Sequence, residues 1–236
     1  MIINLGPDCE IASILQRYNI LELRSPFDSV ITSHYSLCSC LKDKFQKFCD
    51  KKYFNLYFDK QSPMNYYDIV LAHNFKLKEF NQNFDDTKLI NECYKESGFF
   101  CDNISKTIEY YKVNKNIIIN NLPGGGIIDF NELAYNNFLD KYKRRINRFL
   151  ERANGDNTIY YFRCINNLNE IYEIFDILEK NYNCKKFYII GIIKNFDTNN
   201  FKINTNNSKI IVYNNYFKDE IIFYDKLFSD FNNNII

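Results

Sequence analysis

The chain has 236 residues and a mass of 28.3 kDa, which suits one domain of generous size. Apolar residues make up 46% and charged residues 25%, so the chain is neither intrinsically disordered nor collagen-like. Thirty Lys and Arg against 29 Asp and Glu leave a formal charge of +1, which argues against a protein that binds nucleic acid through bulk positive charge.

The chain begins with the pattern of a strand, a tight turn and a helix. The apolar run at 2–5 predicts a short strand, and Gly6-Pro7-Asp8 predicts a turn. Residues 9–18 then place apolar side chains at helical spacing. A second turn is expected at 25–28, where a proline interrupts the pattern.

Predicted helices and strands alternate along the rest of the chain. Helical spacing predicts helices over 35–48, 89–94, 104–111, 132–152, 168–182 and 218–227. Apolar, β-branched and aromatic runs predict strands over 69–72, 117–119, 158–164, 186–193 and 209–213. The order predicts an α/β fold with an open, mainly parallel sheet, helices on both faces in a Rossmann-like three-layer arrangement, and a single domain over 1–236. Such sheets carry their sites at the carboxyl ends of the strands.

Cys9 is the first candidate functional residue because it follows a strand and a turn and falls in the first turn of a helix. Backbone amides and the macrodipole at a helix N-terminus favour an anion such as a thiolate. This setting lowers a cysteine pKa, and an acidic cap at Asp8 partly opposes the effect. The alternative is that Cys9 only packs the start of the helix against the sheet.

A cysteine nucleophile needs a base, and the chain has only two histidines. His73 follows the strand predicted at 69–72, so it lies at the same sheet edge as the Cys9 turn if the two strands are parallel neighbours. The alternative for His73 is a core histidine bonded to a main-chain carbonyl. His34 enters the helix predicted at 35–48, where capping or solvent contact is the expected role.

The eight cysteines are expected to stay reduced. The N-terminal sequence lacks the basic and apolar regions of a secretory signal, which favours a cytoplasmic location. Cys38-Ser39-Cys40, with His34 nearby, is the arrangement that could suggest zinc, but it lacks the usual two-residue gap and a second close pair. We therefore expect no metal and no cofactor. The longest apolar runs are too short for a membrane helix, so no membrane partner is expected either.

Arginines give a second set of candidates. Basic rows on amphipathic helices usually face solvent, which is one interpretation of the row on the 132–152 helix. The functional interpretation takes Arg145 and Arg148, with Arg163 at the end of its strand, as a fork for a substrate carboxylate or phosphate. The Pro-Gly-Gly-Gly segment at 123–126 lacks the spacing of a phosphate-binding loop and is expected to be a loop beside the site.

Four short blocks carry a family resemblance. They read Asn-Leu-Gly-Pro-Asp-Cys-Glu-Ile-Ala at 4–12, Leu-Arg-Ser-Pro-Phe-Asp at 23–28, His-Asn-Phe at 73–75 and Tyr-Lys-Arg-Arg-Ile-Asn-Arg-Phe at 142–149. In order and spacing the chain resembles the family of putative papain-like cysteine peptidases (DUF1796). The resemblance implies Cys9 as the nucleophile and His73 as the base, with Cys before His as in papain-like enzymes.

The chain departs from the family pattern at two positions. Ser29 stands where the family usually has Trp, and Asn74 stands where it usually has Asp. A residue adjacent to His73 in a strand points to the opposite face, so we expect Asp28 to be the third catalytic residue. Ser25 and Asn74 are expected on the substrate side of the site, together with the three arginines.

The sequence thus predicts thiol-dependent hydrolysis or acyl transfer on a peptide or small-molecule substrate, without nucleic acid. Cys9 would attack a carbonyl, His73 would take the thiol proton, and amides at the start of the first helix would bind the oxyanion. The alternative is a non-catalytic module that binds an anionic small molecule or a glycan phosphate through the arginines and the Cys9 turn. A third option is an inactive scaffold of the same fold, which Ser29 and Asn74 favour.

Overall fold

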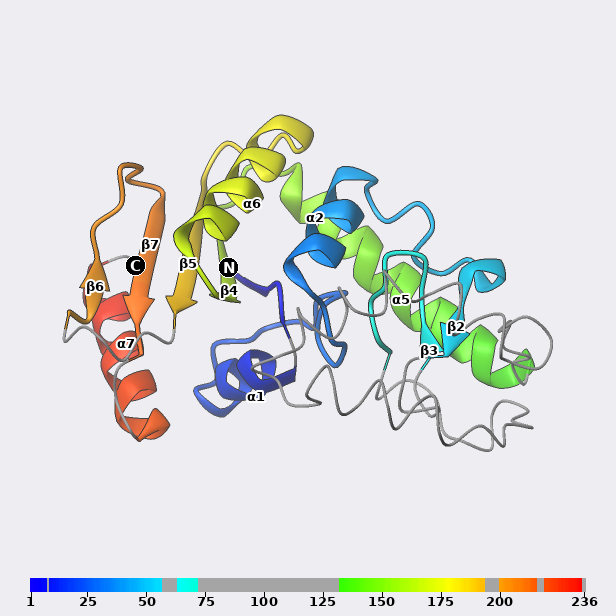
Figure 1. Cartoon of the computed structure of the whole chain (residues 1–236), viewed down its shortest axis with the longest axis horizontal. Helices are drawn as coiled ribbons and strands as arrows, with labels where there is room; N and C mark the ends of the chain where they lie inside the picture. The colour runs from blue at the N-terminus through cyan, green and yellow to red at the C-terminus, as the bar shows by residue number, and fades with distance from the viewer. Residues whose placement is uncertain (8, 57–62, 72–131, 194–199, 216–218, 235–236) are drawn as a thin grey trace.

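The fold is built on a five-stranded sheet in this computed structural model, which describes residues 1–7, 9–56, 63–71, 132–193, 200–215 and 219–234 (Figure 1). In spatial order the strands are β1 (Ile2–Asn4), β4 (Ile159–Ile165), β5 (Phe187–Ile193), β7 (Ile210–Asn214) and β6 (Lys202–Ile203). β1, β4, β5 and β7 are parallel, and only β6 runs antiparallel, at the edge next to β7. The predicted open, mainly parallel α/β sheet is confirmed.

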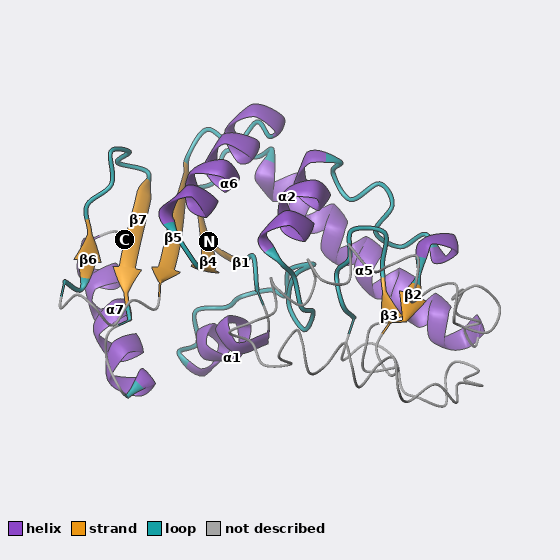
Figure 2. Ribbon diagram, viewed as in Figure 1, coloured by secondary structure: helices purple, strands orange, loops and turns teal. Residues whose placement is uncertain are grey.

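Helices cover both faces of this sheet (Figure 2). One face carries α1 (Cys9–Arg17) and α7 (Glu220–Asn234), and the other carries α2 (His34–Lys42), α5 (Glu132–Ala153) and α6 (Leu168–Asn181). In β4, Tyr160 and Phe162 belong to the α1 side of the core, whereas Tyr161 belongs to the α2 side. Successive side chains of a strand point to opposite faces, so this alternation buries β4 on both.

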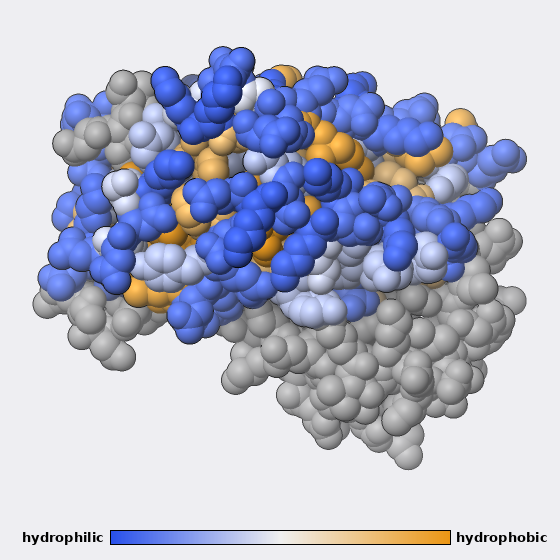
Figure 3. All heavy atoms as spheres, turned by 90° about the horizontal axis from the view of Figure 1, so that it is seen from above, coloured by the Kyte–Doolittle hydropathy of each residue, from blue (hydrophilic) through white to orange (hydrophobic). Residues whose placement is uncertain are grey.

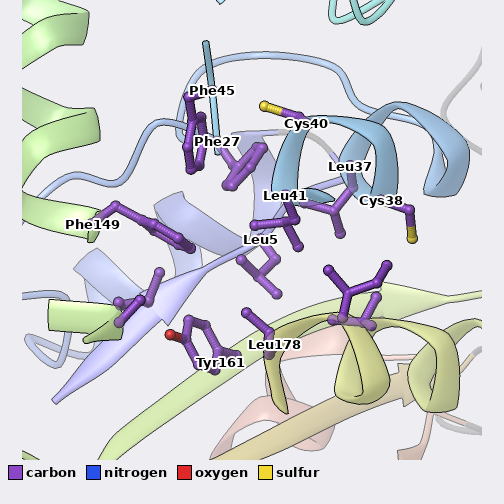
Figure 4. Close-up of a cluster of buried hydrophobic side chains, with 14 of the residues drawn as sticks. Leu5, Phe27, Leu37, Cys38, Cys40, Leu41, Phe45, Phe149, Tyr161 and Leu178 are labelled. Carbon is purple, nitrogen blue, oxygen red and sulfur yellow. The ribbon is translucent and has the colours of Figure 1, made fainter. Parts of the chain in front are cut away.

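Phe27 anchors the loop between α1 and α2 in the larger of the two cores (Figure 4). Its ring centroid lies 5.5 Å from that of Phe45 and 6.1 Å from that of Phe149 on α5, the latter in an edge-to-face arrangement. Phe27 is fully buried, and burial of such a side chain contributes roughly 1.5–3 kcal/mol. The residues on either side of Phe27 are thereby held against α5.

The helix predicted over 35–48 ends earlier than expected. α2 stops at Lys42, and Lys44 and Phe45 have φ angles of 49° and 64°, in the left-handed region. Phe45 and Phe48 are nevertheless buried, as their apolar spacing indicated. Spacing reports which side chains face the core, but it does not report a local reversal of backbone handedness.

Residues 69–71, the described part of the strand predicted at 69–72, do not belong to the five-stranded sheet. Val70 instead forms antiparallel bridges with Ile31 and with Met64. Met64 belongs to a separate two-stranded sheet of β2 (Asn55–Leu56) and β3 (Pro63–Met64), which follows a short 3-10 helix, η1 (Lys51–Tyr53). The condition that would place His73 at the sheet edge of Cys9, a strand at 69–72 running parallel beside β1, is therefore not met by residues 69–71, whose bridges are antiparallel and lie outside this sheet.

The remaining predicted elements divide into two groups. Those over 132–152, 158–164, 168–182, 186–193, 209–213 and 218–227 correspond to α5, β4, α6, β5, β7 and α7, although α7 extends to Asn234. The elements predicted over 89–94, 104–111 and 117–119 and the loop at 123–126 lie outside the described residues. Polar side chains dominate the face of the molecule that Figure 3 shows. No described helix combines the length and the apolar character needed to cross a bilayer.

Candidate functional site

Cys9 is the first residue of α1 and is exposed. Ile11, Ile14 and Leu15 form the buried face of α1 and pack on the sheet side, so the helix start is held in place while Cys9 remains accessible. The turn between β1 and α1 contains Gly6 with a φ of 90°, a left-handed conformation that favours glycine. The exposed thiol therefore stands at the carboxyl end of a parallel strand, where sites in such folds are expected.

A buried cluster of polar side chains links this turn to the loop at 25–28. The Asn4 side-chain amide donates to Asp28 Oδ1 at 2.9 Å, and its carbonyl oxygen accepts from the Gly6 amide at 2.9 Å. Asp28 Oδ2 accepts from the Ser25 amide at 2.7 Å, and the Ser25 hydroxyl donates to the Asn4 main-chain oxygen at 2.8 Å. Asn4 thus connects the loop of Asp28 directly to the turn that precedes Cys9.

The Asp28 carboxylate lies inside the protein. Asp28 has no exposed surface, and Ser25 is 6% exposed. Burial raises the pKa of Asp28, and the hydrogen bonds from Asn4 and Ser25 offset part of that increase. The contacts of the described residues give Asp28 and Ser25 the role of holding two segments together. This role differs from the catalytic role that the sequence predicts for Asp28 and from the substrate-side position that it predicts for Ser25.

Arg163 braces the same turn from β4. Its Nη1 donates to the Leu5 main-chain oxygen at 2.6 Å and to the Thr32 hydroxyl at 2.9 Å, and its Nη2 donates to the Thr32 main-chain oxygen at 2.9 Å. The side chain is 2% exposed. Both terminal nitrogens of the guanidinium are therefore engaged with the protein itself, which does not fit the expected role of Arg163 as a substrate ligand.

Thr32 connects this brace to the segment that leads to His73. Its amide donates to the Pro7 main-chain oxygen at 2.6 Å, and Pro7 precedes Cys9 by two positions. The preceding residue, Ile31, exchanges two main-chain hydrogen bonds of 2.9 Å with Val70, three positions before His73. One short stretch thus ties together the two segments that carry the predicted nucleophile and the predicted base.

Arg145 and Arg148 also bind the protein's own main chain. Arg145 Nη1 donates to the Asp28 oxygen at 3.1 Å, and Arg148 Nη2 donates to the Arg24 oxygen at 3.2 Å. Burial and repulsion from the neighbouring arginines lower the pKa of Arg148. The hollow beside both side chains offers about 10 Å³, room for about one water molecule. Arg145 and Arg148 thus line one hollow, which is too small for a substrate group.

His73 and Asn74 lie outside the described residues, and so do Asp8, Cys93 and Cys101. A hollow of about 520 Å³ lies between α2 and the loop at 66–68. Its lining includes Tyr35, Ser39 and Tyr66 but not Cys9.

A second cluster joins α2 to α6 and contains His34 and Cys38, two residues of the arrangement that could suggest zinc in the sequence. His34 and Cys38 approach each other across one turn of α2, and Glu173 of α6 meets His34 at 2.8 Å. Cys40, which the sequence paired with Cys38, is fully buried and points in another direction (Figure 4). The four-residue spacing of His34 and Cys38 was the available signal, whereas no sequence pattern points to Glu173.

Comparison with known protein families gives a match over most of the chain. The family model described as "Putative papain-like cysteine peptidase (DUF1796)" matches residues 1–187. The matched range runs from β1 through the start of β5, and it includes Cys9, Asp28, His73 and the three arginines of the predicted fork. No curated protein sequence and no solved structure matches the chain.

Proposed function

Since this chain belongs to the family of putative papain-like cysteine peptidases (DUF1796), we propose that it is a thiol-dependent hydrolase or acyl transferase with Cys9 as nucleophile and His73 as base. The observation that carries this proposal is the exposed thiol of Cys9 at the first residue of α1, behind a turn fixed by buried hydrogen bonds. A reactive thiol needs access to its substrate and a fixed position, and Cys9 has both.

The reaction divides into two steps. His73 takes the proton of the Cys9 thiol, and the thiolate attacks the carbonyl carbon of an acyl substrate to form a carbon–sulfur bond. Amides at the N-terminal end of α1 hold the resulting oxyanion, because they point out of the helix end with the positive pole of the helix dipole. The leaving group departs with the proton from His73, and water or an acceptor then releases the acyl group from sulfur.

The connection through Ile31 and Thr32 supports the pairing of Cys9 with His73. Pro7 and Val70 hydrogen-bond to adjacent residues of one extended stretch, so the main chain before each proposed catalytic residue is anchored to the same place.

Asp28 and Arg163 act in this proposal as positioning residues. Asp28 holds Asn4, and Arg163 holds Leu5, so the carboxyl end of β1 is fixed from two sides before the chain turns into α1. Catalytic groups work when packing and hydrogen bonds of their neighbours restrict them to the productive geometry.

The substrate is proposed at the level of the acyl group. The peptidase name comes from the family, and function depends on a site rather than on a fold, so esters, thioesters and amides all remain within the proposal. The alternative of an anion-binding module receives less support. Arg163 is already engaged with Leu5 and Thr32, and the hollow at Arg145 and Arg148 is too small for a phosphate.

The test uses the reactivity of individual cysteines. We expect iodoacetamide to modify Cys9 ahead of the other seven cysteines near pH 6, read by mass spectrometry of tryptic peptides. p-Nitrophenyl acetate should give a burst of about one equivalent of p-nitrophenol, which Cys9→Ser abolishes and Cys184→Ser retains. His73→Gln should slow both reactions. Equal labelling of Cys9 and Cys184 at every pH, or a burst that survives Cys9→Ser, would show that Cys9 is not an activated nucleophile.

A further inference from the structure

Three side chains of different chemistry converge between α2 and α6, away from the Cys9 turn. Cys38 Sγ lies 3.5 Å from His34 Nε2 and 3.8 Å from His34 Nδ1. His34 Nε2 lies 2.8 Å from Glu173 Oε2, and one donor atom from each of the three residues lies within 4.8 Å of the others. A sulfur, a nitrogen and a carboxylate oxygen therefore face one small volume.

These separations are close to those of a zinc site. Zn²⁺ holds thiolate sulfur at about 2.3 Å and imidazole nitrogen or carboxylate oxygen at about 2.0–2.2 Å, so tetrahedral geometry separates sulfur and nitrogen by about 3.5 Å and nitrogen and oxygen by about 3.3 Å. The distance from Cys38 Sγ to His34 Nε2 has the required value, but the sulfur also lies 3.8 Å from Nδ1, so the imidazole ring must turn before the Nε2 lone pair points at a metal shared with the sulfur. The His34–Glu173 contact, at 2.8 Å, would open by about 0.5 Å when a metal replaces the shared hydrogen.

We propose that His34, Cys38 and Glu173 form a binding site for a single transition-metal ion of the Zn²⁺ class. The donor set selects this class, because thiolate and imidazole suit Zn²⁺ and its neighbours in the first transition series, whereas Mg²⁺ and Ca²⁺ prefer oxygen donors. Three protein ligands leave the fourth tetrahedral position to water.

Exposure gives the metal a route into this site. Cys38 is 3% exposed, whereas the side chains of His34 and Glu173 are 19% and 46% exposed. The thiol thus forms the inner wall, and the other two ligands stand at the solvent side. Lys42 binds Glu173 Oε1 at 3.1 Å, which leaves Oε2 directed to the metal and orients the carboxylate from outside.

Metal binding exchanges protons for the ion. The Cys38 thiol gives up its proton as the sulfur–metal bond forms, and the His34 nitrogen that faces the metal is unprotonated. Affinity should accordingly increase with pH.

The site would also fasten α2 to α6. His34 comes two positions after Thr32, and Thr32 forms hydrogen bonds with Pro7 and Arg163. A metal that links His34 to Glu173 therefore holds one end of the stretch that fixes the Cys9 turn.

The test uses the reduced full-length chain after removal of metals by a chelator, with Co²⁺ as the spectroscopic probe and Zn²⁺ as the competitor. We expect about one equivalent of Co²⁺ to bind with a thiolate-to-cobalt charge-transfer band, which Zn²⁺ removes. Cys38→Ser should abolish the band. His34→Gln and Glu173→Gln should weaken binding by at least about 10-fold, the lower end of what loss of even an outer-shell partner costs.

Two controls separate this site from the other thiols. Cys9→Ser and Cys184→Ser should keep the band and the stoichiometry, so the outcome does not depend on the proposed role of Cys9. Added Zn²⁺ should also raise the melting temperature of the wild type and of Cys9→Ser but not of His34→Gln. The proposal is overturned if the wild-type chain gives no thiolate–cobalt band, or if the band survives Cys38→Ser. Glu173 is half exposed, so Glu173→Gln should fold, and an unchanged Co²⁺ affinity in that variant would also overturn the proposal.

Discussion

The main chains of Ile31 and Val70 exchange two hydrogen bonds, each 2.9 Å long. The next residue after Ile31 is Thr32, whose amide donates to the oxygen of Pro7. Pro7, two positions before Cys9, and Val70, three positions before His73, are therefore hydrogen-bonded to adjacent residues of the chain. Their common attachment point is itself held by the buried guanidinium of Arg163.

Arg163→Lys should destabilise the fold although it keeps the positive charge. A lysine ammonium cannot reproduce the planar fork that spans Leu5 and Thr32, so at least one buried carbonyl loses its donor. An unsatisfied buried polar group costs about 1–3 kcal/mol, and we expect a loss of that size in the free energy of unfolding measured in urea. Arg144→Lys, at an exposed position of α5, is the matched control and should change it by less than about 0.5 kcal/mol. Equal effects of the two variants would contradict the role given to Arg163.

Thr32→Val tests whether the brace positions Cys9. Valine has nearly the shape of threonine but cannot accept the 2.9 Å hydrogen bond from Arg163 Nη1. We expect a loss of about 1–3 kcal/mol in the free energy of unfolding. We also expect slower iodoacetamide labelling of Cys9 under conditions where the variant is fully folded, because a looser turn no longer holds the thiol in place. Labelling of Cys184 should not change, and a Cys9 rate equal to that of the wild type would separate the brace from the proposed site.

Asp28 should make the protein less stable as pH rises through the acidic range. Its folded-state pKa is raised above the ordinary value, so the folded protein binds the proton more tightly than the unfolded chain does. Stability from this group is complete below the unfolded pKa and decreases as pH rises through the folded pKa. Asp28→Asn removes this dependence.

The measurement for Asp28 is the free energy of unfolding in urea at several values between about pH 3 and pH 7, for the wild type and Asp28→Asn. Other carboxylates contribute equally to both proteins, so the difference isolates Asp28. We expect Asp28→Asn to gain stability relative to the wild type as pH increases. A difference that moves in the opposite direction would mean that the folded-state pKa of Asp28 is lowered.

Gly191 lies where β5 packs on Ile171 of α6. A Cβ atom at this position would come within 2.6 Å of Ile171 Cδ1, 3.1 Å of Ile165 Cδ1 and 3.3 Å of Val212 Cγ2. Gly191→Ala should therefore cost about 1–3 kcal/mol through overpacking. Ile171→Val removes the nearest of these atoms, so the double variant should be less destabilised than the sum of the single variants. A double-mutant cycle in urea checks this, and strict additivity would contradict the close approach.

Local patterns predicted most of the secondary structure because they depend on neighbours in sequence. The continuous apolar run of β5 and the helical stripe of α5 appear in the sequence as they do in the fold. The end of α2 and the segment at 69–71 were missed, since left-handed residues at 44 and 45 and an antiparallel bridge at Val70 have no periodic signal.

In the candidate site, too, the sequence predicts what depends on neighbouring residues and misses what depends on distant ones. Cys9 was found from its position after a strand and at a helix start, which is local information. The sequence predicts Arg163 as a substrate ligand and Asp28 as a catalytic residue. The local sequence around a charged residue near a strand end or a turn does not show whether its side chain faces solvent or the interior. Their burial depends on partners distant in sequence, Leu5 for Arg163 and Asn4 for Asp28.

What the sequence by itself determined was the alternation of strands and helices and the side chains that face the core, because hydrophobic burial acts through periods of two and 3.6 residues. Only the tertiary structure decided which polar groups meet. Glu173 reaches His34 from 139 positions away, and Arg163 reaches Thr32 from 131 positions away. A buried polar group must find a hydrogen-bonding partner wherever packing brings one, and that condition leaves no mark on the neighbouring sequence.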